Sequence, residues 1–147
     1  MWVIFEGLDK AGKGTLEREF LKAVNYRHIV VDRGPAGYVT FDVLFNRYSD
    51  AAKAELSNEL AVIKKCSNNF LIVYCKVQPE IAMRRIKEHN ETCPYEYENA
   101  QDLYDNAVQI LYRESGLNVV DVDTSKPIDE CVQIIIKKLE EVQKGEL

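Results

Sequence analysis

A loop rich in glycine and lysine, directly after a short apolar run, is the feature that most constrains the fold of this chain. The apolar run Trp2–Phe5 leads into Gly7-Leu8-Asp9-Lys10-Ala11-Gly12-Lys13-Gly14-Thr15. The spacing is G-x-x-x-x-G-K, in which glycines let the backbone curl so that successive N–H groups point at phosphate oxygens. A following helix adds its positive N-terminal end. The chain is therefore predicted to begin with a strand, a phosphate-binding loop and a helix.

The side chains of this loop have separate predicted roles. Lys13 supplies a mobile positive charge for the β- and γ-phosphates of a nucleotide. Gly14 stands where the usual motif has Ser or Thr, so Thr15 is the nearest hydroxyl that can ligate Mg²⁺. The residues predicted to bind nucleotide phosphates are Gly7, Ala11, Gly12, Lys13, Gly14 and Thr15.

Short apolar runs alternate with helical patterns along the rest of the chain. The runs typical of buried parallel strands are Trp2–Phe5, His28–Asp32, Phe70–Val77 and Leu117–Val122. The predicted helices cover Thr15–Val24, Pro79 through Ile86, Asn99–Tyr112 and the residues after Pro127. This alternation predicts one α/β domain over residues 1–147, with three layers in which helices flank a small parallel sheet.

The second predicted strand ends in an acid and a base. Asp32 and Arg33 follow Val31 at the carboxyl edge of the sheet, where open α/β folds bind ligands. Asp32 can orient Mg²⁺ or its water, and Arg33 can bind a second phosphate. The alternative is a plain ion pair in a loop, which contributes little.

Composition excludes several classes of function. The chain has 19 Lys and Arg against 24 Asp and Glu, a net charge of −5, and no concentrated basic stretch, so we expect no nucleic-acid partner. No apolar run approaches the ~18 residues of a membrane span, and we expect no membrane contact. The four cysteines lack C-x-x-C spacing, which favours reduced thiols in a cytoplasmic protein, or in the host cytoplasm if the chain is viral.

Together these features resemble the thymidylate kinase family of P-loop nucleotide kinases. The opening from Phe5 to Lys13 is similar to the family's F-E-G-x-D-x-A-G-K motif, and Val31-Asp32-Arg33 is similar to its D-R-Y/H motif. The segment from Pro79 to Ile86 is similar to P-E-x-A-x-x-R-I, which leads into the family's lid. The chain is a shortened form, because 16 residues separate Thr15 from Asp32 and the family's R-E-P strand is missing there.

The resemblance implies a P-loop NTPase fold, ATP and Mg²⁺ as cofactors, and small-molecule nucleotides as partners in nucleotide biosynthesis. The implied reaction is dTMP + ATP to dTDP + ADP. Asp9 is implied near the acceptor sugar, Arg33 on the acceptor phosphate, and Arg85 near the phosphate contacts of the lid. Arg33, Asp32 and Lys13 are therefore the implied catalytic residues.

Lys10 is predicted to supply a further catalytic cation. Phosphoryl transfer spreads negative charge over the equatorial oxygens, which a positive group besides Mg²⁺ and Lys13 must meet. In the family that the chain resembles, this extra cation lies either inside the phosphate-binding loop or in the lid. The expected lid, His89–Glu98, contains no Lys or Arg, and Lys10 stands at the loop position that some members fill with a basic residue. The resemblance therefore implies this role for Lys10; an exposed loop lysine is the alternative.

Two other functions stay open. A deoxynucleoside kinase needs a carboxylate base near the acceptor hydroxyl, and Glu6 and Asp32 are candidates for it. A non-catalytic nucleotide-binding or regulatory protein is also compatible with the shortened acceptor region. Arg33 favours a monophosphate acceptor, because a phosphate needs a permanent cation. The sequence does not name the base or sugar of the acceptor, and it leaves a homodimer open.

Overall fold

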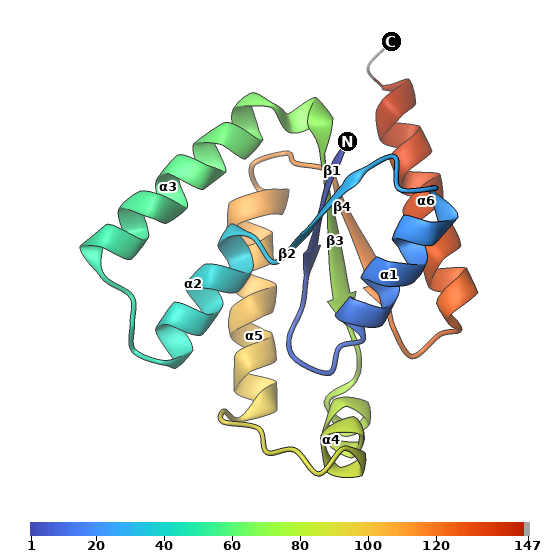
Figure 1. The fold of residues 1–147 in the computed structure, drawn as a ribbon. Coiled ribbons are helices and arrows are strands. Elements are labelled where there is room, and N and C mark those ends of the chain that lie inside the picture. The colour runs from blue at the N-terminus through green and yellow to red at the C-terminus, as the bar shows by residue number, and fades with distance from the viewer. Residues whose placement is uncertain (146–147) are drawn as a thin grey trace.

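Within residues 1–145, the part of the chain that the computed structural model describes, four parallel strands form one sheet with helices on both faces (Figure 1). The strands are β1 (Trp2–Glu6), β2 (Ile29–Asp32), β3 (Phe70–Lys76) and β4 (Val119–Asp123). Their order is β2-β1-β3-β4, and every neighbouring pair is parallel. The predicted small parallel α/β sheet is confirmed, and its strands lie within two residues of the predicted bounds.

Six helices connect and cover these strands in the described residues. They are α1 (Lys13–Ala23), α2 (Pro35–Leu44), α3 (Asp50–Lys65), α4 (Pro79–Glu88), α5 (Tyr97–Val108) and α6 (Ile128–Lys144). A π-helical turn, Gln109–Arg113, continues α5, and a short 3₁₀ turn, Ser67–Asn69, precedes β3. Among these residues no helix combines the length and apolar character needed to cross a bilayer.

The face of the sheet covered by α1 and α6 is apolar. Its strand and helix residues interdigitate, as the rings of Phe5 and Phe20 do with centroids 5.8 Å apart. The buried residues of this face are Val3, Phe5, Ala11, Leu16, Phe20, Leu71, Val73, Cys75, Val122, Cys131, Val132, Ile135, Leu139 and Val142.

The face covered by α2 and α5 is built differently, because tyrosines take up much of its core. The rings of Tyr74 and Tyr104 stack with centroids 5.5 Å apart. The buried residues of this cluster are Ile4, Leu8, Ala36, Ile63, Ile72, Tyr74, Val77, Ala82, Ile86, Tyr97, Ala100, Tyr104, Val108, Tyr112 and Leu117. Each tyrosine brings a hydroxyl group into the interior, where it needs a hydrogen-bond partner.

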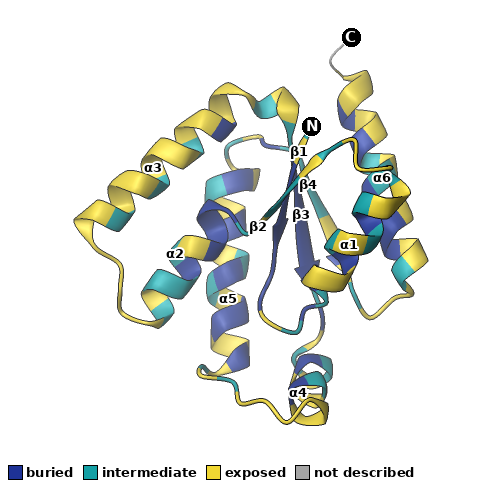
Figure 2. Ribbon diagram, viewed as in Figure 1, coloured by how far each residue is buried: buried dark blue, intermediate teal, exposed yellow. Residues whose placement is uncertain are grey.

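The helices α2 and α3 were not predicted from the sequence. In Figure 2, α3 is exposed along most of its length, and Ile63 is its one buried residue. A helix with so little burial has no apolar stripe to reveal it. Its local signals are the side-chain cap, in which Ser49 Oγ accepts a hydrogen bond from the Ala52 N–H at 3.1 Å, and its Ala, Glu, Leu and Lys content.

Parallel pairing brings the carboxyl ends of all four strands to the same edge of the sheet. The loop of residues 7–12 follows β1 there, the Asp32–Arg33 pair ends β2, and the turn of residues 124–127 follows β4. This edge therefore carries the sequence-predicted site residues.

Candidate functional site

The loop of residues 7–12 has a backbone conformation that depends on glycine. Gly7 has a φ of 150° and Gly12 a φ of 77°, both in the region that side chains with a Cβ rarely adopt. A Cβ on Gly7 would also lie 2.7 Å from the carbonyl oxygen of Cys75 on β3. The two glycines that define the sequence motif are thus required by the local geometry.

The first turn of α1, directly after this loop, presents backbone donors. Gly12 is its N-cap residue, and within the described residues no side chain accepts a hydrogen bond there and no acidic residue lies in the first turn. The position of a Cβ on Gly14 has open space around it. Uncapped N–H groups at the positive end of a helix, with room in front of them, suit an anionic group such as a phosphate.

Lys13, on that first turn, lies close to Asp32 at the end of β2. Its ammonium group pairs with the Asp32 carboxylate and lies 3.9 Å from Glu17 Oε1. The Lys13 side chain is nearly buried, whereas more than half of the Asp32 side chain is exposed. Burial lowers the pKa of Lys13, and the positive charge of Arg33 adds to this decrease. The structure therefore brings together two of the predicted catalytic residues.

Arg33 lies on the other side of Asp32 and points back towards the loop. Its Nη2 donates a hydrogen bond to Asp9 Oδ1 at 2.9 Å, and its guanidinium lies 4.4 Å from the centroid of the Phe41 ring. Arg33 itself has a φ of 66°, in the left-handed region. The residues predicted near the acceptor sugar and the acceptor phosphate, Asp9 and Arg33, are thus direct neighbours.

The segment between α4 and α5 lies against the same loop. Lys10 Nζ donates to Glu91 Oε1 at 2.7 Å. The hydroxyl of Tyr95 donates to Asp9 Oδ2, and the hydroxyl of Tyr97 donates to the Asp9 carbonyl, both at 3.2 Å. Lys10, the predicted additional cation, is therefore in an ion pair with this segment.

Arg85 connects the loop to the turn after β4. Its Nη1 donates to the Lys10 carbonyl at 2.8 Å, and its Nη2 donates to the Thr124 carbonyl at 3.1 Å. In this arrangement the Arg85 guanidinium binds backbone oxygens on both sides of the candidate site. It lies close enough to the loop for the predicted phosphate contact, but its present partners are carbonyls.

The predicted Mg²⁺ ligands Thr15 and Asp32 are exposed at the same edge. Within residues 1–145, no group of three or more His, Cys, Asp and Glu side chains is arranged to hold a metal ion. Mg²⁺ commonly takes one or two protein ligands together with substrate phosphates and water. The hydroxyl and carboxylate present here fit that mode of binding.

Glu6 has a role that sequence reasoning missed. It ends β1, it is fully buried, and its carboxylate accepts hydrogen bonds from the hydroxyls of Tyr104 and Tyr112 and from the N–H groups of Gly34 and Gly37. Burial raises the pKa of Glu6, and these four hydrogen bonds oppose the rise. Glu6, Tyr104 and Tyr112 are called the Glu6 network below. The signal in the sequence is an acid that ends an otherwise apolar strand beside a glycine.

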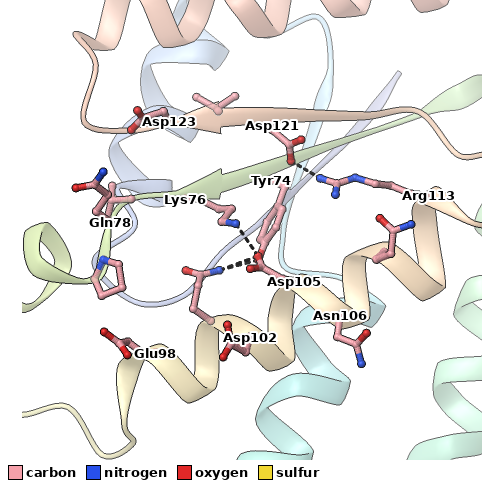
Figure 3. A pocket seen from close by; sticks show the side chains of 15 residues that line it. Tyr74, Lys76, Gln78, Glu98, Asp102, Asp105, Asn106, Arg113, Asp121 and Asp123 are labelled. Atoms are coloured by element: carbon pink, nitrogen blue, oxygen red, sulfur yellow. Dashed lines mark hydrogen bonds and ion pairs between the residues drawn. The ribbon is translucent and has the colours of Figure 1, made fainter.

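A cavity of about 1030 Å³ lies apart from this site, between α5 and the strands β3 and β4. Figure 3 shows Glu98, Asp102 and Asp105 on α5, across from Asp121 and Asp123 on β4. Two bases in its lining form ion pairs, Lys76 with Asp105 at 2.9 Å and Arg113 with Asp121 at 2.5 Å. No residue of the loop 7–12 lines this acidic cavity.

No protein-family model matches the chain, and neither does any curated protein. Among solved structures, the chain is similar to the YorR protein from Bacillus subtilis, a crystal structure in complex with phosphorylated GDP. The TM-score is 0.62, with 20% sequence identity over 95% of this chain and 96% of that chain. The two proteins thus share a fold over nearly their whole lengths, and a protein with this fold binds a nucleotide.

Proposed function

We propose that the protein is a P-loop kinase that transfers a phosphoryl group from ATP to a deoxynucleoside monophosphate, with thymidylate as the first acceptor to test. The observation that carries the proposal is a pair of cations at one edge of the sheet. Lys13 stands at the uncapped start of α1, and Arg33 stands beside Asp9 at the end of β2. Lys13 would bind the phosphates of the donor, and Arg33 would bind the phosphate of the acceptor.

On the donor side, the N–H groups of the first turn of α1 and the ammonium of Lys13 would bind the phosphates of ATP. Lys13 must exchange its contact with Asp32 for a contact with phosphate. That exchange would leave the exposed Asp32 carboxylate, with the hydroxyl of Thr15, to hold Mg²⁺. When bound, Mg²⁺ supplies positive charge to the phosphate oxygens as negative charge develops on them.

On the acceptor side, the guanidinium of Arg33 offers a planar pair of donors to the monophosphate. Its present partner Asp9 is more than half exposed and can be replaced by an entering phosphate or turn towards the sugar. Phe41 supports the guanidinium from one side, and Tyr95 contacts both Asp9 and the Phe41 ring. These residues orient the acceptor towards the loop.

The surroundings of the carboxylates favour a monophosphate over a nucleoside acceptor. A nucleoside kinase needs a carboxylate that reaches the acceptor hydroxyl. Glu6, one candidate for that base, is fully buried and accepts four hydrogen bonds from the protein. Asp32, the other candidate, is the carboxylate that this proposal assigns to Mg²⁺ once Lys13 contacts phosphate.

The test is a measurement of ADP release with ATP, Mg²⁺ and a panel of nucleosides and nucleoside monophosphates. We expect turnover with monophosphates, and with thymidylate above the others. Turnover with nucleosides only would identify a deoxynucleoside kinase. Tight ATP binding without turnover for any acceptor would identify a non-catalytic nucleotide-binding protein.

Lys13→Ala is the matched variant for this assay. It removes the ammonium that is proposed to face the phosphates, and we expect turnover to fall by about 10²–10³-fold or more, by analogy with other preorganised charge-stabilising groups. The fold should be retained, because burial already disfavours the charged form of Lys13. Wild-type turnover in a correctly folded variant would refute the assignment of this loop.

A further inference from the structure

The carboxylate of Glu6 lies between the two segments that carry the candidate site. Gly7, the first residue of the loop, follows Glu6 directly in the chain. The second segment, at the start of α2, binds the carboxylate through two backbone donors: the N–H of Gly34 lies 3.1 Å from Oε1 and that of Gly37 lies 3.3 Å from Oε2. A Cβ on Gly37 would lie 2.8 Å from Oε1, so glycine permits this approach. The carboxylate thus occupies the positive end of α2.

The two tyrosines of the Glu6 network extend these contacts, one towards each segment. The Tyr104 hydroxyl donates to Glu6 Oε1 at 2.7 Å and accepts a hydrogen bond from the Gly7 N–H at 2.9 Å. The Tyr112 hydroxyl donates to Glu6 Oε2 and accepts a hydrogen bond from the Ala36 N–H at 3.0 Å. Tyr104 therefore connects Glu6 to the loop, and Tyr112 connects it to the start of α2.

Arg33 lies between β2 and α2 in a backbone conformation that needs support. A left-handed φ of 66° is uncommon for a residue with a long side chain. Hydrogen bonds hold the backbone on both sides of it: the Arg33 N–H donates to the Phe5 carbonyl at 2.8 Å, and the next N–H, that of Gly34, donates to Glu6. This conformation directs the Arg33 side chain to Asp9.

From these contacts we infer that Glu6 is a positioning residue that fixes the loop at Gly7 and the turn at Arg33 relative to each other. The inference rests on the proposed function, in which the loop binds the donor and Arg33 binds the acceptor. In-line transfer depends on the placement of the two phosphates, and a shift of about 1 Å can cost about 10²-fold in rate. Glu6 does not touch either substrate, because it is fully buried.

The experiment uses two variants that each remove one hydroxyl and keep the aromatic ring. Tyr104→Phe removes the acceptor of the Gly7 N–H, and we expect it to raise the KM for ATP about tenfold. Tyr112→Phe removes the acceptor of the Ala36 N–H, and we expect it to raise the KM for the monophosphate about tenfold, with the KM for ATP nearly unchanged.

Tyr74→Phe is the matched control. Tyr74 stacks on Tyr104 in the same core, and its hydroxyl donates to a different carboxylate, Asp105, at 2.6 Å. Because the Tyr74 hydroxyl contacts neither the loop nor the start of α2, we expect Tyr74→Phe to leave both KM values near those of the wild type. A variant that only loosens the core would change both KM values alike. If Tyr104→Phe and Tyr112→Phe behave like this control, or shift both KM values equally, the inference is wrong.

Hydrogen exchange separates this inference from the proposed function. The backbone amide of Gly7 should exchange faster in Tyr104→Phe, and that of Ala36 should exchange faster in Tyr112→Phe, when measured by NMR. Glu6→Gln, which loses one acceptor oxygen, should speed exchange at Gly34 or Gly37 as well. If the wild type transfers no phosphate, the proposed function fails, and these exchange rates alone decide the inference: unchanged rates overturn it.

Discussion

The two faces of the sheet are packed with different chemistry. The core on the α1 and α6 side has no tyrosine among its buried residues, whereas the core on the α2 and α5 side has four: Tyr74, Tyr97, Tyr104 and Tyr112. Three of these hydroxyls donate to a carboxylate, and Tyr97 donates to the loop backbone. Burial of apolar side chains stabilises the fold but is not directional. Hydrogen bonds are directional, and they fix particular groups at particular distances.

This difference suggests a division of labour between the faces. Apolar packing against α1 and α6 stabilises the sheet through burial alone. The tyrosine-containing face places the loop, Arg33 and the acceptor side of the candidate site. The predictions below test this division with one variant at a time, starting from the largest expected effect.

Phe20→Ala tests the apolar face. Phe20 is fully buried against Phe5, and removal of its ring should lower the free energy of unfolding by about 3–5 kcal/mol. Urea unfolding checks this value. The KM values of the folded fraction should stay within about twofold of the wild type, because the Phe20 ring lies in the apolar core and has no donor or acceptor that could position the loop. A large change in either KM with little loss of stability would contradict the division.

Lys10→Gly tests the loop that joins the two faces. We expect kcat to fall by about 10²-fold or more, with little change in ATP affinity, if Lys10 supplies charge to the transition state as predicted. Lys10 has a φ of 64°, which glycine adopts without strain, so the stability should not fall. Steady-state kinetics and thermal unfolding check both statements.

Glu91→Gln is the control for Lys10. It removes the ion-pair partner of Lys10, 2.7 Å away, and keeps the lysine itself. We expect this variant to retain kcat. A normal kcat in Lys10→Gly would transfer the assignment to Arg84 or Arg85 on α4.

Arg33→Met tests the tyrosine-containing face from the substrate side. We expect the KM for the monophosphate to rise at least about tenfold, because a guanidinium–phosphate contact is lost, while ATP affinity stays nearly constant. Titration of each nucleotide by calorimetry separates the two effects. A loss of ATP affinity instead would place Arg33 on the donor side and favour a nucleoside acceptor.

Glu17→Gln on α1 should have the smallest effect. Burial raises the pKa of Glu17, and its Oε1 has no hydrogen-bond partner in the described part of the chain. The ionised carboxyl therefore costs stability above its raised pKa, and this cost disappears as the pH falls and the folded protein takes up the proton. We expect the variant to gain less than about 1 kcal/mol at neutral pH and nothing in acid, as measured by urea unfolding. A constant gain at every pH would contradict this explanation.

The fold could be predicted where burial leaves a pattern in the sequence. All four strands are short apolar runs, and α6 shows its buried stripe at Cys131, Ile135 and Leu139. The prediction that all four strands are buried holds for β1 and β3 in the centre of the sheet, whereas the edge strand β2 has no buried residue and the edge strand β4 has only Val122. The order β2-β1-β3-β4 has no such signal, because periodicity shows which residues are buried but not which strands are neighbours. The exposed α3 has no stripe at all.

The part of the candidate site that follows the strands could be predicted from the sequence. The loop and the Asp32–Arg33 pair follow strands, and parallel strands end at one edge. The partners of Glu6 could not be predicted in the same way. Tyr104 and Tyr112 are eight residues apart, a spacing that places both on one face of a helix, so the pattern indicates burial. It does not reveal that their hydroxyls meet at one carboxylate, nor that a π-helical turn contains Tyr112.

The hydrogen bonds of Glu6 also determine when, during synthesis of the chain, the candidate site can form. Tyr104 and Tyr112 lie 98 and 106 residues after Glu6. A ribosome adds residues at ~5–20 per second, so for several seconds the N-terminal strand and loop exist without the groups that fix them. Contacts this distant in sequence also form slowly after synthesis. The candidate site can thus be completed only late, once α5 and the turn after it have emerged.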